Sequence, residues 1–141
     1  MQFISHSVEQ TQLFAEQFAS TLVGGEVLLL DGDMGAGKTH FVKGLALGLG
    51  ISDVITSPTF ALHNAYQGKL QLNHFDFYRI DDPAEAEMLG LDEFFYQKNG
   101  VCAVEWWQNV ADLIPKNVAI KISITKLSET SRQITVEKAQ Q

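Results

Sequence analysis

The chain has 141 residues, of which 45% are hydrophobic, and its formal net charge is −7 at pH 7; this size and composition fit one globular domain over residues 1–141. The negative charge argues against strong, direct, sequence-independent nucleic-acid binding, which depends on Lys and Arg side chains, so any RNA is expected to be reached only through a partner. Without an apolar run of about 18 residues or a signal-peptide pattern, we expect a cytoplasmic protein with no membrane association.

The first predicted element is a helix that begins near Ser7. Ser7 followed three residues later by Gln10 resembles a capping box, in which two side chains bond the first backbone N–H groups of a helix. Phe14 and Phe18 then fall on one helical face, and the glycines at 24–25 mark the end. We expect this helix to cover a sheet.

The next segment carries a phosphate-binding loop motif. Residues 26–31 form a short apolar run typical of a strand buried on both faces. Residues 32–39 then read Gly-Asp-Met-Gly-Ala-Gly-Lys-Thr, and an amphipathic helical pattern follows from Phe41 to Leu49. Because strand, loop and helix stand in the order that the motif requires, the sequence predicts binding of a nucleoside triphosphate.

The residue types of this loop suit phosphate chemistry. The backbone N–H groups of Gly35, Ala36 and Gly37, together with the positive end of the helix, can meet phosphate oxygens. Lys38 adds a mobile cation for the outer phosphates. The Thr39 hydroxyl is the expected protein ligand of Mg²⁺, an ion that takes its other oxygens from water, phosphate and carboxylate.

The remaining segments predict an antiparallel pair beside the parallel strands. Cys102 lies in an apolar strand and is expected in the core. The outcome is an α/β protein of the phosphate-loop NTPase kind, with a mixed parallel and antiparallel sheet flanked by helices. The expected elements are a hairpin of strands 60–67 and 70–77, a helix from Asp82 to Gly90, a strand at 101–105, a helix at 109–114, and paired strands at 118–124 and 132–137.

Two carboxylates at strand ends are candidates for the rest of the site. In phosphate-loop enzymes an acidic residue at the tip of a neighbouring strand faces Mg²⁺ or orients water, and Glu105 has this position. Its alternative role is to mark where the strand meets solvent. Asp76 shares a strand face with His74 and could bind metal, hold water or act as a base. Otherwise it lies on a solvated face or pairs with Arg79.

Other polar and aromatic residues leave two interpretations open. His74 is more often a structural group than a catalytic one. Arg79 either stabilises phosphoryl charge or makes a surface pairing. Residues 56–60 supply the hydroxyls that a phosphate-sensing loop needs, or they form an ordinary turn. Trp106 either shields the site or packs.

Four segments together resemble the bacterial TsaE family, the ATPases of tRNA threonylcarbamoyladenosine biosynthesis. They are the phosphate loop at 32–39, Ser-Pro-Thr-Phe at 57–60, His-Phe-Asp-Phe-Tyr-Arg at 74–79 and Val-Glu-Trp at 104–106. The resemblance implies a Mg²⁺-dependent protein that binds ATP or ADP and hydrolyses ATP weakly. It would act with the TsaD and TsaB proteins in modifying tRNA beside the anticodon, and it would not transfer the threonylcarbamoyl group itself.

The resemblance also implies roles for particular residues. Lys38 and the loop amides would hold the phosphates, Thr39 and Glu105 would hold Mg²⁺, and Asp76 would assist hydrolysis. Thr11 matches a threonine near the adenine.

Four further assignments come from the same likeness. Arg132 lies where the last strands approach the nucleotide. His40 replaces a second small hydroxyl residue, although its backbone N–H can still face phosphate. Trp106 matches the family's tryptophan beside the acidic residue. A switch-like loop would comprise Ser57, Pro58, Thr59 and Phe60.

A small-molecule kinase of the phosphate-loop class is the competing interpretation. Such kinases typically carry several lid arginines, whereas this chain has only Arg79 and Arg132. A GTPase ranks last, because the guanine-reading segment Asn-Lys-x-Asp is missing and the text at 98–100, Lys-Asn-Gly, does not supply it.

Overall fold

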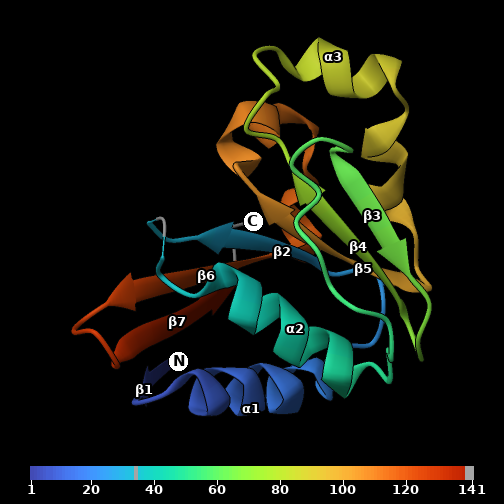
Figure 1. Ribbon diagram of the computed structural model, residues 1–141. Helices are drawn as coiled ribbons and strands as arrows, with labels where there is room; N and C mark the ends of the chain where they lie inside the picture. Colours follow the sequence, from blue (N-terminus) through green and yellow to red (C-terminus); the bar gives the residue numbers. More distant parts are fainter. Residues whose placement is uncertain (34, 139–141) are drawn as a thin grey trace.

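The computed structural model describes residues 1–33 and 35–138, so Met34 of the phosphate-loop motif and the last three residues lie outside the described part. Within it, seven strands form one sheet in the order β1-β7-β6-β2-β5-β4-β3 (Figure 1). Strands β6, β2, β5 and β4 are parallel neighbours, whereas β1, β7 and β3 pair antiparallel. The strands are β1 Gln2–Ser5, β2 Val27–Asp31, β3 His63–Tyr66, β4 Gln71–Asp76, β5 Gly100–Glu105, β6 Ala119–Lys126 and β7 Arg132–Lys138.

Helices cover both faces of this sheet. Helices α1 (Val8–Ala19) and α2 (Lys38–Gly48) lie side by side and pack against one face of the sheet. They are below the sheet in Figure 1. The other face carries α3 (Pro83–Met88) and the 3₁₀ helices η1 (Leu91–Tyr96) and η2 (Trp107–Leu113), while the short η3 (Lys116–Val118) leads into β6. The result is a three-layered α/β arrangement.

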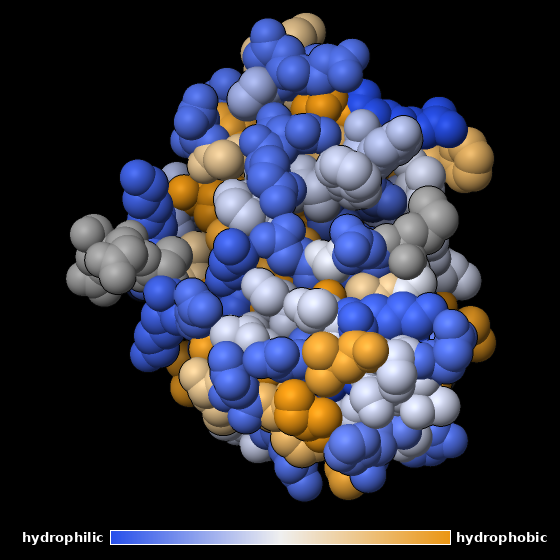
Figure 2. Space-filling model, turned by 90° about the vertical axis from the view of Figure 1, so that its left-hand side faces the viewer, coloured by the Kyte–Doolittle hydropathy of each residue, from blue (hydrophilic) through white to orange (hydrophobic). Residues whose placement is uncertain are grey.

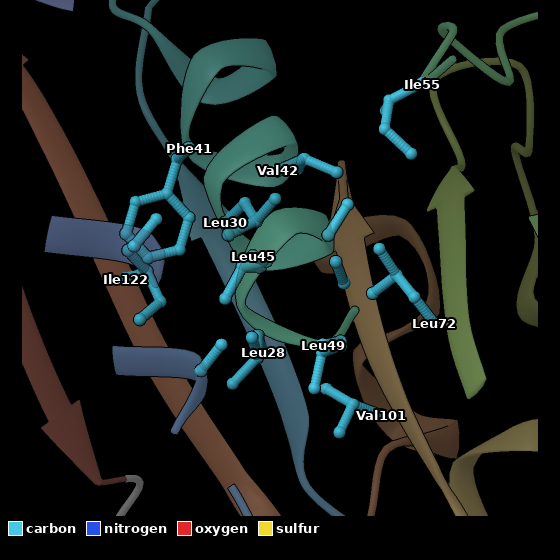
Figure 3. Close-up of a cluster of buried hydrophobic side chains, with 14 of the residues drawn as sticks. Leu28, Leu30, Phe41, Val42, Leu45, Leu49, Ile55, Leu72, Val101 and Ile122 are labelled. Atoms are coloured by element: carbon cyan, nitrogen blue, oxygen red, sulfur yellow. The ribbon is translucent and has the colours of Figure 1, made fainter. Parts of the chain in front are cut away.

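Alternation along the strands divides the core between the two faces. Leu28 and Leu30 of β2 pack with α2, whereas Val27 and Leu29 of the same strand point to the opposite cluster. Figure 3 shows Leu45 of α2 above this part of β2, and its side chain is fully buried. Because the strand before the phosphate loop and the helix after it are both anchored in one core, the two ends of the loop are fixed.

Helices α1 and α2 approach each other closely through small residues. A Cβ atom placed on Gly44 would lie 2.7 Å from the Cβ of Ala15, and one on Gly48 would lie 2.6 Å from the Cβ of Ala19. Both distances are below any normal contact, so the two glycines let the helix backbones meet. No local sequence motif marks this contact, because it joins residues of two different helices.

The predicted hairpin is confirmed, but its first strand begins later than expected. Strand β3 starts at His63 instead of residue 60, because Leu62 adopts a left-handed φ of 68° and donates its N–H to the carbonyl of Pro58. This closes a turn in which Phe60 is 84% exposed. Within the described part of the chain, Phe60 has no neighbouring strand, so an extended backbone would bring it no hydrogen bonds of a sheet.

Two other elements differ from the sequence-based expectation. Strand β1 was not expected, because it has four residues and pairs with β7 from the far end of the chain. The helix expected at 109–114 is a 3₁₀ segment that begins at Trp107 and is kinked at Val110, which has a non-helical φ of −131°. Both features depend on tertiary contacts rather than on local pattern.

The surface toward which β2 and β6 point in Figure 1 is mostly hydrophilic. Figure 2 shows this side, where hydrophobic residues form small separate groups among polar ones. No helix in the described ranges 1–33 and 35–138 is long and apolar enough to cross a membrane.

Candidate active site

A cavity of about 740 Å³ opens beside the carboxyl ends of β2, β4 and β5. This edge is where ligands bind in open parallel α/β sheets. Its walls come from the phosphate loop and the start of α2, the ends of β4 and β5, the loop around residue 57, the start of α1 and the turn between β6 and β7. Distant parts of the sequence therefore meet at one place.

The phosphate loop has the backbone shape that its glycines allow. Gly35 and Gly37 have φ values of +80° and +110°, which side-chain-bearing residues rarely adopt. Gly37 is also the N-cap of α2 and offers no side-chain hydrogen bond to the helix. The first N–H groups of α2 are consequently left for a ligand, as in anion sites at helix N-termini.

Most of the loop residues predicted to bind nucleotide line the cavity. Gly35, Gly37, Lys38, Thr39 and His40 do so. The side chain of Ala36 is buried instead, with 1% exposure, so only its backbone is available to that role.

Glu105 ends strand β5 inside this cavity and not at open solvent. The parallel register places it opposite Asp76 of β4. Its Oε2 accepts a hydrogen bond of 2.8 Å from His74 Nε2, and its Oε1 lies 3.7 Å from Lys38 Nζ. The Glu105 side chain is only 12% exposed. Glu105 therefore does not lie where the strand meets open solvent.

Three effects set the pKa of Glu105. Burial raises it, but the hydrogen bond and positive charge of His74 lower it, and the charge of Lys38 lowers it further. The net result is a pKa below the ordinary glutamate value. Glu105 is therefore ionised at neutral pH and presents charged oxygen to the cavity.

Asp76 is held by the loop that precedes β3. Thr59 Oγ1 donates to Asp76 Oδ2 over 3.1 Å, and the backbone N–H of Tyr78 donates to Oδ1 over 3.0 Å. The Ser57 hydroxyl lies 2.6 Å from that of Thr59. Because Thr59 gives its hydrogen to Asp76, Ser57 must be the donor to Thr59. Two hydroxyls of the predicted switch-like loop thus form a chain that ends on a carboxylate.

Burial and contacts decide between the earlier alternatives for Asp76 and Arg79. Asp76 is 7% exposed, so it does not lie on a solvated face. Its two oxygens bond to Thr59 and Tyr78, while the Arg79 guanidinium lies 4.5 Å from the ring centre of Phe60. Arg79 is outside the described lining of the cavity, and the same holds for Pro58 and Phe60. Arg79 is thus placed in a surface contact rather than at the site.

Trp106 stands at the edge of the cavity in an unusual backbone conformation. Its φ is +56°, in the left-handed region, and its ring meets that of Tyr78 edge to face at 4.9 Å. Trp106 is 45% exposed and Tyr78 is 60% exposed. A strained, half-exposed aromatic pair therefore flanks the site on the side of the switch-like loop.

Thr11 of α1 also lines the cavity. It is 2% exposed, and its hydroxyl is 2.7 Å from that of Ser5. Ser5 in turn donates to the carbonyl of Ser7 over 2.7 Å, so Thr11 is the donor to Ser5. The Thr11 oxygen can still accept a hydrogen bond.

Sequence reasoning missed several neighbours of Thr11. They come from the start of α1 and from the turn between β6 and β7, and no local motif marks them. Only the pairing of β1 with β7 brings the two segments together. These additional lining residues are His6, Ser7, Val8, Glu129 and Thr130.

Arg132 lines the cavity but also binds the phosphate loop itself. Its Nε donates to the carbonyl of Ala36 over 2.9 Å, and its Nη2 donates to that of Gly35 over 3.2 Å. Nη1 donates to the carbonyl of Ser128 over 2.9 Å. One guanidinium therefore ties the phosphate loop to the β6–β7 turn.

The donor set suits a magnesium ion that arrives with phosphate. Thr39, Asp76 and Glu105 supply hard oxygen atoms to one cavity. Within the described residues no three His, Cys, Asp or Glu side chains form a group able to hold a metal. Mg²⁺ usually takes one or two protein oxygens and completes its shell with water and phosphate, so the residues present fit it.

Comparisons with known proteins point to one family. The family model "Threonylcarbamoyl adenosine biosynthesis protein TsaE" matches residues 5–134. The tRNA threonylcarbamoyladenosine biosynthesis protein TsaE of Treponema pallidum is 42% identical over 136 residues, covering 96% of this chain and 99% of that protein. Its namesake in Bacillus subtilis is 44% identical over 128 residues, covering 90% of this chain and 78% of that protein.

A solved structure has a similar fold. The crystal structure of Bacillus subtilis YdiB superposes with a TM-score of 0.83 at 37% identity, covering 99% of this chain and 86% of that one. The sheet and its flanking helices thus form the phosphate-loop NTPase fold. With a family model that matches nearly the whole chain and relatives above 40% identity, this chain belongs to the TsaE family.

Proposed function

We propose that this chain is a Mg²⁺-dependent protein that binds ATP, hydrolyses it weakly and acts in the threonylcarbamoyladenosine modification of tRNA next to the anticodon. It would do so by acting on or regulating a complex of TsaD and TsaB. One observation carries the proposal: a single cavity joins the uncapped N-terminus of α2, Lys38, Thr39 and two carboxylates. The names of the relatives in Treponema pallidum and Bacillus subtilis point to the same pathway.

Binding of the triphosphate follows from the loop. The N–H groups at the start of α2 and the Lys38 ammonium supply positive charge to the phosphates. Thr39 and Glu105 would hold Mg²⁺, which would supply positive charge to neutralise the phosphate oxygens. Lys38 has a flexible stem and contacts Glu105 only at 3.7 Å, so it can turn to the phosphates without breaking a close hydrogen bond.

Hydrolysis is assigned to the other carboxylate. Asp76 is fixed by Thr59 and by the N–H of Tyr78, and it orients the attacking water or accepts its proton. The aromatic pair Tyr78 and Trp106 at the edge of the site remains largely exposed. Exposed aromatic rings at the edge of a site suit contact with another protein, which supports a role for partners.

The test is steady-state nucleotide hydrolysis by the purified chain, alone and with TsaD, TsaB and tRNA. Stimulation by the partners is expected. Phosphoryl transfer to a small acceptor in the absence of partners would contradict the proposal and favour the small-molecule kinase. Lys38→Ala should lose nucleotide affinity, whereas Lys43→Ala, a change of the same residue type on α2 outside the lining of the cavity, should keep it.

A second test addresses the metal. Glu105→Ala should strongly weaken Mg²⁺-dependent hydrolysis, because it removes the only carboxylate that ends β5. Unchanged turnover over a magnesium titration would exclude Glu105 as a metal ligand.

A further inference from the structure

The two oxygen atoms of Glu105 have different neighbours. Oε2 accepts a short hydrogen bond, 2.8 Å, from His74 Nε2, whereas Oε1 faces Lys38 Nζ at 3.7 Å. An ionised carboxylate carries no hydrogen, so Nε2 of the imidazole must be the donor. One oxygen is thus bonded to the sheet, and the other is turned toward the phosphate loop.

His74 is far less able to move than Lys38. Its side chain is 2% exposed, against 16% for Lys38, and it stands within β4 on the face shared with Asp76 and Glu105. Among the described residues, the other ring nitrogen, Nδ1, is buried and has no hydrogen-bond partner. The bond to Glu105 is therefore the polar contact that orients this buried ring, and the ring cannot swing away when a ligand binds.

This difference bears on the metal ion, and the step rests on the proposed function of Glu105. If Lys38 turns to phosphate, Oε1 becomes available while Oε2 stays bonded to His74. Mg²⁺ accepts single carboxylate oxygens in an octahedral shell, whereas the larger Ca²⁺ readily takes both oxygens of one carboxylate. We infer that His74 is a positioning residue that restricts Glu105 to coordination through one oxygen and so makes the site select Mg²⁺ over Ca²⁺.

The experiment compares His74→Asn with His74→Gln. The amide nitrogen of Gln reaches about as far from the backbone as Nε2 of histidine, whereas that of Asn stops near the position of Nδ1. The affinity for ADP is measured by calorimetry with Mg²⁺, with Ca²⁺ and with a chelator. The wild-type chain should bind ADP more tightly with Mg²⁺ than with Ca²⁺. H74N should lower that preference by about tenfold, as is typical for loss of an outer-shell partner, and H74Q should keep most of it.

Several outcomes would overturn the inference. One is a wild-type chain without a preference for Mg²⁺, and another is an H74N variant that changes both affinities by the same factor, as a purely structural residue would. Thermal unfolding without nucleotide shows whether each variant folds. If H74N does not fold, the Nε2–H proton of His74 in the ¹⁵N-labelled wild-type chain decides: it should stay hydrogen-bonded when Mg²⁺ and ADP are added, and its release would refute the inference.

Glu105→Gln separates this inference from the proposed function. If E105Q leaves the metal dependence of ADP binding unchanged, Glu105 is no metal ligand and the proposed metal site itself fails. If E105Q abolishes the metal dependence while H74N keeps the preference for Mg²⁺, the metal site stands and only the role of His74 is wrong.

Discussion

At the scale of single residues, the two carboxylates of the site are supported by different parts of the molecule. Asp76 is bonded to Thr59, which belongs to a loop, whereas Glu105 is bonded to His74, which is buried in the sheet. A movement of the loop would therefore change the geometry of Asp76 and leave that of Glu105 intact. On the proposed function, such a division would let a partner that touches the loop control hydrolysis without displacing Glu105.

Thr59→Val tests the support of Asp76. The change keeps the shape of the side chain but removes the donor to Asp76 Oδ2. Because a hydrogen bond to a charged group contributes about 1.5–3 kcal/mol, we expect turnover to fall by about tenfold or more, with ADP affinity nearly unchanged. Thr59→Ser, which keeps the hydroxyl, should lose less activity. Equal turnover in Thr59→Val and wild type would show that this bond is absent in the working state.

The lowered pKa of Glu105 predicts a pH dependence of stability in the nucleotide-free chain. The unfolded chain takes up a proton on this residue at a higher pH than the folded chain does. The stabilisation is therefore complete above the ordinary glutamate pKa and is lost as the pH falls through the folded-state value. Urea unfolding between about pH 6 and pH 3 should show a smaller loss of stability for Glu105→Gln than for wild type. Parallel curves would contradict the shift.

At the scale of the elements, the close contact of α1 and α2 holds the helix that carries the phosphate loop. Gly44 and Gly48 lie one helical turn apart on α2 and face Ala15 and Ala19 on α1. The two helices thus behave as one layer behind the loop. Displacement of α1 would also displace Thr11, so the packing of small residues sets the distance between the two ends of the cavity.

Gly44→Ala tests this contact. Alanine forms helices better than glycine by about 1 kcal/mol, so an unobstructed site would gain stability. Here the added methyl group meets Ala15, and we expect a net loss of about 1–3 kcal/mol in the free energy of unfolding, measured in urea. Leu47→Ala, at a position that is 56% exposed on the same helix, is the control and should cost less. A more stable Gly44→Ala variant would show that the helices separate easily.

Features formed by residues close together in the sequence could be predicted, whereas features that depend on long-range contacts could not. The strand, loop and helix around Lys38 are contiguous, so pattern and motif predicted them together. Alternation placed His74 and Asp76 on one face of their strand, but the bond from His74 to Glu105 depends on the register of β4 against β5, which neither strand encodes alone. The same limit hid β1 and the lining residues His6 and Thr130, since long-range pairing alone brings them to the cavity.

At the scale of the whole molecule, the net charge limits how strongly the chain can bind RNA directly. The net charge of −7 opposes a polyanion, and Lys38 and Arg132, two of its ten basic residues, are engaged at the cavity. A route to tRNA through a partner protein is consistent with this balance.

A gel-shift assay tests that route. At physiological salt, we expect no shift of tRNA by the chain alone at about 10 µM, because non-specific binding requires cations that neutralise phosphates. The TsaD and TsaB proteins are first tested with tRNA in the absence of this chain. Adding them together with the chain should then shift the tRNA into a complex. A shift by the chain alone that weakens as salt is added would contradict the prediction.

The pairing of β1 with β7 links completion of the cavity to the order of synthesis. Gln2 lies opposite Thr135, and the amino group of Met1 donates to the carbonyl of Val136 over 3.1 Å. On the ribosome, β1 emerges before β7 and must therefore wait for it, and Arg132 reaches the phosphate loop equally late. Until then the cavity lacks the wall that Glu129, Thr130 and Arg132 supply. On the proposed function, ATP would stabilise chains only after translation has passed these residues, and chains truncated before them would lack that protection.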